Sequence, residues 1–207
     1  MSFGFLDVAV TPTVKAVQRE LGVAHLWENF KGHREFDRFT ENEARFIVER
    51  DSFYMATISE TSWPYVQHRG GPPGFLKIID ERTLAFADYR GNFQYITVGN
   101  LSASDKASLF LIDYPRRVRL KIYVHAEAVS LDADAALTEQ VLEGTSGKPE
   151  RIIRLRLQTF GWNCPQHITP RYTEAELAEA LAPMRARLDA LTAENAALRQ
   201  AACTAAH

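Results

Sequence analysis

Hydrophobic residues in the middle of the chain recur in short runs rich in β-branched and aromatic side chains, separated by tight turns. In the last of these runs, Ile153, Leu155 and Leu157 alternate with polar residues. Alternation of this kind is typical of a strand with one packed face and one wet face. The pattern predicts seven strands, over residues 53–58, 64–68, 75–79, 83–87, 107–112, 118–130 and 151–162.

Helical signals are fewer and lie before and between the predicted strands. Thr40 and Glu43 form a capping box, which predicts a helix that ends near Arg50. Pro12 fits the first turn of a helix that ends at Gly22. Because tight turns join most of the strands, we expect an antiparallel β-barrel with small helices and not a parallel sheet. Two further short helices are predicted, over residues 91–101 and 132–142.

These elements divide the chain into three parts. Residues 1–39 are predicted to form an N-terminal arm with a short helix, and residues 40–172 the β-barrel. Residues 173–207 are predicted to form a C-terminal helix. The arm mixes aromatic and charged residues without a clear period, so we expect it to wrap the barrel or a partner subunit.

Apolar residues recur every seven positions in the C-terminal part. Leu181, Leu188 and Asn195 form one series. The second series, offset by four, is Leu177, Met184, Leu191 and Leu198. Two interleaved heptad series predict a coiled coil, and Asn195 at an a position favours a parallel pair. A single amphipathic helix packed on its own barrel is the alternative. Pro183 lacks a backbone N–H, so we expect the helix to break there.

Composition and charge narrow the possible functions. With 46% hydrophobic and 24% charged residues, the chain resembles an ordinary globular protein. A formal charge of −2 argues against a nucleic-acid partner or a membrane-surface role, and no apolar run is long enough to span a membrane. The N-terminus has no basic region typical of a signal peptide, so we expect a cytoplasmic protein. Neither Cys164 and Cys203 nor the six histidines show metal-ligand spacing, so no metal is expected.

Two loops carry candidate binding chemistry. Arg69 stands between His68 and the pair Gly70–Gly71, and Arg90 precedes the helix predicted to begin at Gly91. Arginines beside paired glycines and at a helix N-terminus are ingredients of a phosphate site, because backbone N–H groups and guanidinium forks both bind anionic oxygens. Two hairpin turns with solvated arginines are the alternative, but the proximity of the two loops favours an anion site.

A third polar cluster follows the last strand and contains Asn163, Gln166 and His167 between two prolines. Proline-stiffened placement suits a binding platform. A stiff connection to the C-terminal helix is the alternative.

Three motifs occur in order: WPYVQHRGGPPGF, DYRGNFQYITVGNL and NCPQH. Together they resemble the flavin-nucleotide-binding proteins related to pyridoxamine 5′-phosphate oxidase, in particular a small FMN-binding branch. The resemblance covers residues 40–172. It implies a split β-barrel and a homodimer that binds FMN at the dimer interface.

The resemblance also implies roles for individual residues. Arg69 and Lys77 correspond to basic contacts with the cofactor phosphate, and Arg119 corresponds to an inward polar position on the long strand. Gln166 and His167 correspond to a segment that reaches the partner's flavin. The remaining candidates for cofactor binding lie in the two loops: His68, Gly70, Asp88, Tyr89, Arg90, Gly91 and Asn92.

We therefore expect an FMN-dependent oxidoreductase that acts on a small molecule. No residue identifies itself as a catalytic acid or base, and His167 and His68 are only weak candidates. The chain lacks a counterpart of the C-terminal tryptophan and arginine motif that shapes the substrate site of the true oxidase, so vitamin B6 oxidation is not implied. The alternatives are a non-catalytic flavin carrier, the same barrel with a deazaflavin or haem, and an assembly protein built around the C-terminal helix.

Overall fold

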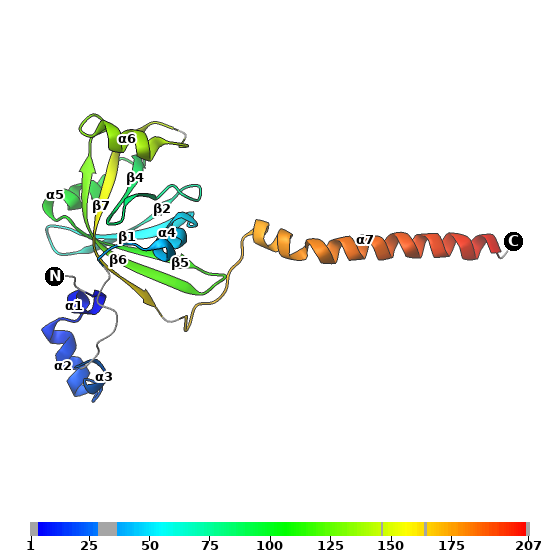
Figure 1. Cartoon of the computed structure of the whole chain (residues 1–207), viewed down its shortest axis with the longest axis horizontal. Helices are drawn as coiled ribbons and strands as arrows, with labels where there is room; N and C mark the ends of the chain where they lie inside the picture. The colour runs from blue at the N-terminus through cyan, green and yellow to red at the C-terminus, as the bar shows by residue number, and fades with distance from the viewer. Residues whose placement is uncertain (1–3, 29–36, 146, 164, 206–207) are drawn as a thin grey trace. The chain divides into compact units, whose positions relative to one another are not determined.

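A seven-stranded antiparallel sheet dominates the structure, with strand order β2-β1-β5-β6-β7-β4-β3 (Figure 1). This computed structural model describes residues 4–28, 37–145, 147–163 and 165–205, so Cys164 and parts of the predicted arm lie outside it. The topology confirms the predicted antiparallel fold. The strands are β1 (Ser52–Ile58), β2 (Pro64–Gly70), β3 (Lys77–Asp80), β4 (Thr83–Tyr89), β5 (Lys106–Asp113), β6 (Val118–Val129) and β7 (Pro149–Asn163).

Side-chain contacts show that the sheet is rolled into a barrel. β2 is the first strand in the sheet order and β4 the sixth, yet Arg69 of β2 lies 2.7 Å from Asp88 of β4. Phe53 of β1 packs edge-on against Phe86 of β4, with ring centroids 5.5 Å apart. In the described part of the chain, no backbone pairing joins β2 to β3 or β4. The barrel is therefore split along this line, which side chains alone bridge.

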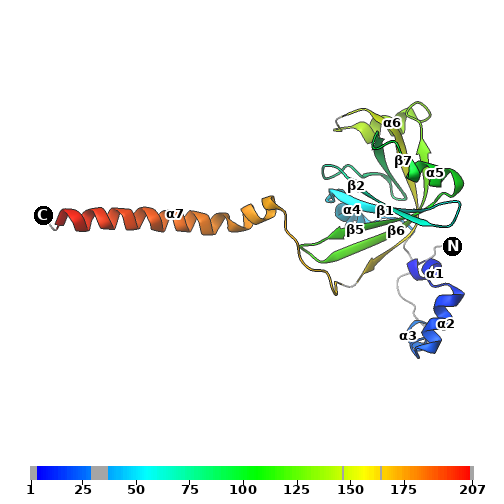
Figure 2. The ribbon, with the colours of Figure 1, turned by 180° about the vertical axis from the view of Figure 1, so that it is seen from behind.

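Two apolar clusters hold the barrel and its helices together. The larger fills the barrel interior and includes Phe46 and Ile47 of α4 (Glu41–Val48). The predicted capping box at the start of α4 is confirmed, with the Thr40 amide donating to a Glu43 carboxylate oxygen at 3.1 Å. The smaller cluster lies on the other face of β4 and β7, under α6 (Ala135–Leu142) (Figures 1 and 2).

Helix α5 (Ile96–Ala103) begins later than the sequence pattern predicts. The backbone at Phe93 and Tyr95 is left-handed, with φ of 63° and 50°. A right-handed helix cannot pass through such residues, so the expected start at Gly91 is wrong. As a consequence, Arg90 lies in the loop before α5 and not in the first turn of a helix.

The described part of the N-terminal arm contains three short helices, α1 (Phe5–Ala9), α2 (Pro12–Glu20) and α3 (His25–Glu28). The ring of Phe5 stacks on Tyr123 of β6 at 4.9 Å, and the Lys121 ammonium lies 4.5 Å above the Phe5 ring. Burial lowers the pKa of Lys121, and the nearby charge of Arg119 lowers it further. This part of the arm therefore packs on the outer face of the barrel.

The chain divides into two compact units: residues 1–113 with 117–166, and residues 114–116 with 167–207. The second unit consists mainly of α7 (Glu174–Ala205), a continuous helix. The expected break at Pro183 is wrong, because the helix continues through that residue at the cost of one backbone hydrogen bond. No helix in the described part of the chain is both long and apolar enough to cross a membrane.

Candidate functional site

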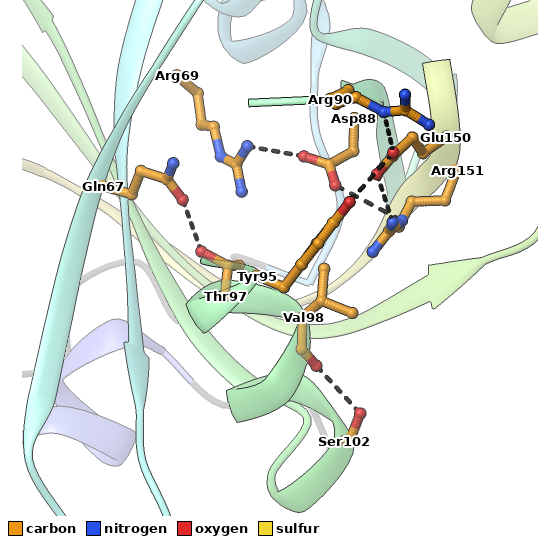
Figure 3. A network of polar contacts seen from close by, with 10 residues as sticks. All are labelled: Gln67, Arg69, Asp88, Arg90, Tyr95, Thr97, Val98, Ser102, Glu150 and Arg151. Carbon is orange, nitrogen blue, oxygen red and sulfur yellow. Dashed lines mark hydrogen bonds and ion pairs between the residues drawn. The ribbon is translucent and has the colours of Figure 1, made fainter. Parts of the chain in front are cut away.

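Two arginines flank a buried aspartate where β2 meets β4. Asp88 is only 6% exposed, and Arg69 donates from Nη1 to its Oδ1 atom at 2.7 Å (Figure 3). Arg151 Nε lies 3.8 Å from the Oδ2 atom of the same carboxylate. Arg151 stands directly opposite Asp88 in the register of β4 and β7. A buried carboxylate in this position holds both guanidinium groups in fixed orientations.

Glu150 forms a second centre beside this pair. It accepts hydrogen bonds from Arg90 Nε at 2.8 Å, Arg151 Nη2 at 2.7 Å and the Tyr95 hydroxyl at 3.2 Å. The hydrogen bond from Arg90 lowers the pKa of Glu150, and the same contact raises the pKa of Arg90. Glu150 is therefore an ionised carboxylate that forms an ion pair with the guanidinium of Arg90.

The start of α5 completes the cluster. Tyr95 is the N-cap residue of α5, its side chain makes no capping hydrogen bond, and the Arg151 guanidinium lies 5.1 Å from its ring centroid. The Thr97 hydroxyl of α5 donates to the Gln67 amide oxygen of β2 at 2.8 Å. In Figure 3, Gln67, Arg69, Asp88, Tyr95 and Thr97 face a common region. Side chains from β2, β4, β7 and α5 are thus gathered in one place.

Arg69 retains hydrogen-bonding capacity in this arrangement. Its Nε atom is buried and has no hydrogen-bond partner among the described residues. A buried N–H group without a partner is uncommon and costly, and an anionic oxygen would satisfy it. Three guanidinium groups against two carboxylates leave one excess positive charge in the cluster. An anionic ligand such as a phosphomonoester fits both the excess charge and the free donor.

The glycines after Arg69 serve packing. A Cβ atom on Gly71 would come within 2.7 Å of the Phe75 ring, so only glycine allows this contact. The Gly71 amide donates to the Asp51 carbonyl at 2.9 Å and is therefore occupied. Gly70 pairs with Ser52 at the end of β2, and its role in cofactor binding stays a prediction.

Three predicted basic or imidazole contacts do not lie with this cluster. His68 points away from Arg69 on the opposite face of β2, and its ring meets Tyr54 edge-on at 5.6 Å. Lys77 donates from Nζ to the Glu143 carbonyl at 3.0 Å, near the end of α6. Arg119 precedes the buried Leu120 on β6, so strand alternation places its side chain on the face of the strand opposite the barrel core. The cofactor roles of all three stay predictions.

The remaining candidates are spread over exposed positions. Asn92 accepts the Gln94 amide at 3.2 Å in the loop before α5, and Gly91 beside it is exposed. Tyr89 is exposed and lies close to Gly147. Gln166 and His167 are exposed, and His167 belongs to the second unit. Within the described ranges, no group of three or more metal-ligating side chains forms a metal site.

Five members of the cluster were not predicted as site residues. Arg151 is 63 residues after Asp88, and the sequence does not show that β7 pairs with β4. The stretch PERII does place two charges directly before a strand, which is a weak signal. The five residues are Gln67, Tyr95, Thr97, Glu150 and Arg151.

A split antiparallel barrel with an arginine-rich site beside the line of its split defines the class of this protein. Comparison with family models identifies the family. A model described as pyridoxamine 5′-phosphate oxidase matches residues 39–161, which is more than half of the chain. The chain therefore belongs to the pyridoxamine 5′-phosphate oxidase family, as its motifs predict.

Solved structures share the fold at low sequence identity. The HupZ protein of Group A Streptococcus is 14% identical with a TM-score of 0.51, covering 65% of this chain and all of that one. A putative pyridoxamine 5′-phosphate oxidase from Lactobacillus delbrueckii is 18% identical with a TM-score of 0.48, over 61% and 96%. An FMN-binding protein from Syntrophomonas wolfei is 15% identical with a TM-score of 0.44, over 73% and 97%. A comparison with curated proteins found no match.

Proposed function

We propose that the protein binds FMN through its phosphate at the arginine cluster and acts as a flavin-dependent oxidoreductase on a small molecule. The observation that carries the proposal is Arg69, which is held by Asp88 and has a buried Nε–H without a partner in the described chain. Membership of the pyridoxamine 5′-phosphate oxidase family supports a flavin as the phosphorylated ligand.

The residues of the cluster have distinct tasks in this proposal. Arg69 would bind the phosphate from a position fixed by Asp88. Arg90 would contribute after exchanging its bond to Glu150 for the more strongly charged phosphate. Gln67 and Thr97 offer polar groups of the kind that bind ribityl hydroxyls. Bound FMN supplies the capacity to accept and return a hydride, and the protein orients it and shields it from water.

A homodimer is part of the proposal. Tyr54 and Ile58 of β1 and Val66 of β2 expose apolar side chains on the outer face of the sheet. The strand register places the three on the same face, next to the exposed Trp63. A second copy of this face would cover these side chains, as apolar patches of soluble proteins commonly require.

Loss of the arginines tests the site. We expect the Arg69→Ala/Arg90→Ala protein to stay folded and to bind FMN about 100-fold more weakly or worse, because two charge-assisted contacts are removed. Arg156→Ala is the matched control, since Arg156 is an exposed arginine of β7 on the face away from the cluster. Full flavin occupancy in the double variant would refute the site.

The spectrum and mass of the bound chromophore test the cofactor and the activity. Purified protein should be yellow and should release FMN on heating, as identified by mass spectrometry. Reduction by NADH or NADPH and reoxidation by a second substrate would establish an oxidoreductase. A bound flavin that does not turn over would indicate a carrier, and release of a deazaflavin would change the cofactor while leaving the site assignment intact.

A further inference from the structure

Helix α7 carries an apolar stripe that runs from Leu177 to Leu198. The continuous helix places both heptad series on one side. The six apolar members are exposed in the described chain, from 38% for Leu181 to 70% for Met184. Removing side chains of this size from water lowers the free energy of the protein. We therefore expect another surface to cover the stripe. The polar residues within and beside the stripe indicate which surface this is.

We propose that α7 pairs with α7 of a second copy of the chain as a parallel, in-register coiled coil. Asn195 lies at an a position inside the stripe. In a parallel in-register pair the two Asn195 amides meet in one layer, where each donates to and accepts from the other. An antiparallel pair or an apolar surface would leave the amide buried without a partner, which is costly.

Charges beside the stripe select the same arrangement. Glu194 lies at a g position and Arg199 at the e position five residues later. In a parallel in-register pair each g residue faces the e residue of the next heptad on the partner, so Glu194 meets Arg199 of the second copy. Two-fold symmetry forms this ion pair twice. Within one helix, residues five apart are not neighbours, so the pattern has no equivalent use inside a single α7.

The rest of the helix is compatible with this pairing. Pro183 falls at a c position, on the side away from the seam. The other potential g–e′ pairs are Ala180 with Arg185 and Arg187 with Thr192, and neither brings like charges together. No position therefore opposes the parallel register, and Asn195 with the Glu194–Arg199 pair specifies it.

Cysteine crosslinking in the full chain tests the register. In a background with Cys164→Ser and Cys203→Ser, Leu198→Cys introduces a thiol at a d position near the end of the stripe. A parallel in-register pair brings the two thiols together, so mild oxidation should yield a covalent dimer. Ala197→Cys at the adjacent c position is the matched control and should crosslink little. Equal crosslinking of both variants, or none at position 198, would overturn the proposal.

Charge exchange tests the partner. Glu194→Arg and Arg199→Glu, each added to the Leu198→Cys chain, create two repulsive pairs in a homodimer and should lower crosslinking about fivefold. An equimolar mixture of the two variants restores both attractive pairs, so its heterodimer should crosslink at the original level. Failure of the mixture to recover would exclude the parallel register. Both readouts are independent of flavin, so they distinguish this proposal from the proposed function.

Discussion

At the scale of single residues, Asp88 organises the candidate site. It is buried in ion pairs with Arg69 and Arg151 and so fixes two cationic groups that would otherwise repel one another. A carboxylate in this position lowers the affinity for an anion slightly, because it offsets positive charge. It also removes the cost of ordering the arginines when the ligand arrives.

The substitution Asp88→Asn tests whether Asp88 both offsets the positive charge of the site and holds the arginines in order. The substitution leaves the partly buried Arg69 without its counter-charge and leaves Arg151 paired with Glu150 alone, so we expect the free energy of unfolding to fall by about 1–3 kcal/mol. Added FMN or inorganic phosphate should recover part of the loss, since the anion replaces the carboxylate. Thermal unfolding with and without ligand measures both effects.

Asp113→Asn is the control for the Asp88 variant. Asp113 is also buried and pairs with an arginine, Arg50 Nη1, at 2.8 Å. Its loss should destabilise the fold without any specific recovery by phosphate or FMN. Equal recovery of both variants would show that the anion stabilises the protein elsewhere.

At the residue scale, the sequence allowed three members of this cluster to be predicted: Arg69, Asp88 and Arg90. Arg69 and Arg90 stand in local motifs whose chemistry is visible without a fold. Arg151 and Glu150 join them only because β7 pairs with β4, and that pairing depends on tertiary packing. Lys77 shows the opposite case, since it follows the same motif but its side chain reaches the carbonyl of Glu143.

At the scale of elements, Glu43 joins the start of α4 to β7. Its carboxylate accepts the Trp162 indole N–H of β7 at 2.8 Å and the Thr40 amide at 3.1 Å. Burial alone would raise the pKa of Glu43, but the hydrogen bonds from Thr40 and Trp162 outweigh it and lower the pKa below the usual 4.5. Glu43 therefore stabilises the fold in its ionised form.

This shift predicts how stability depends on pH. We expect Glu43→Gln to lower the free energy of unfolding by about 1–2 kcal/mol at neutral pH. Because the folded-state pKa is depressed, the contribution of Glu43 is complete above its unfolded-state pKa and is lost as the pH falls through the folded-state value. The difference in the free energy of unfolding between the native and Glu43→Gln proteins should therefore shrink as the pH falls below 4.5, the usual pKa of a glutamate. Urea unfolding between pH 3 and 7 (roughly the carboxylate titration range) measures it.

Glu41→Gln controls for the change of charge on α4. Glu41 lies in the first turn of the same helix but is exposed. Its replacement should leave the stability nearly unchanged across the same pH range. A parallel pH dependence for both variants would assign the effect to the helix dipole and not to the contacts of Glu43.

The positions of helices and strands could be predicted from the sequence where a local pattern of side chains determines them. The strands and the capping box at Thr40 are cases of this kind. The start of α5 was placed too early because the left-handed backbone at Phe93 and Tyr95 leaves no trace in hydrophobic periodicity. The continuity of α7 at Pro183 was missed because one lost hydrogen bond does not end a helix of this length.

At the scale of the whole molecule, the candidate site lies where two ends of the sheet meet. Gln67 and Arg69 belong to the edge strand β2, whereas Asp88 belongs to β4 beside the other edge. A ligand bound here would contact both ends. We therefore expect FMN to stabilise the native state strongly, by about 2.7 kcal/mol at a free concentration 100 times its dissociation constant.

Thermal unfolding across a range of FMN concentrations measures this linkage. The midpoint should rise with the logarithm of the ligand concentration in the native protein. The Arg69→Ala/Arg90→Ala protein should show no such rise over the same range. Riboflavin, which lacks the phosphate, provides the ligand control and should stabilise both proteins weakly.

The line along which the barrel is split also determines which strand unfolds first. Among the described residues, β6 shares backbone hydrogen bonds with a strand on each side, whereas β2 shares them with β1 alone. On its other side β2 is held by the contact of Arg69 with Asp88. Amide protons of β2 should therefore exchange with solvent by local peeling, long before global unfolding exposes β6. A ligand bound at the split would hold β2 in place, so loss of that ligand would speed the earliest step of unfolding.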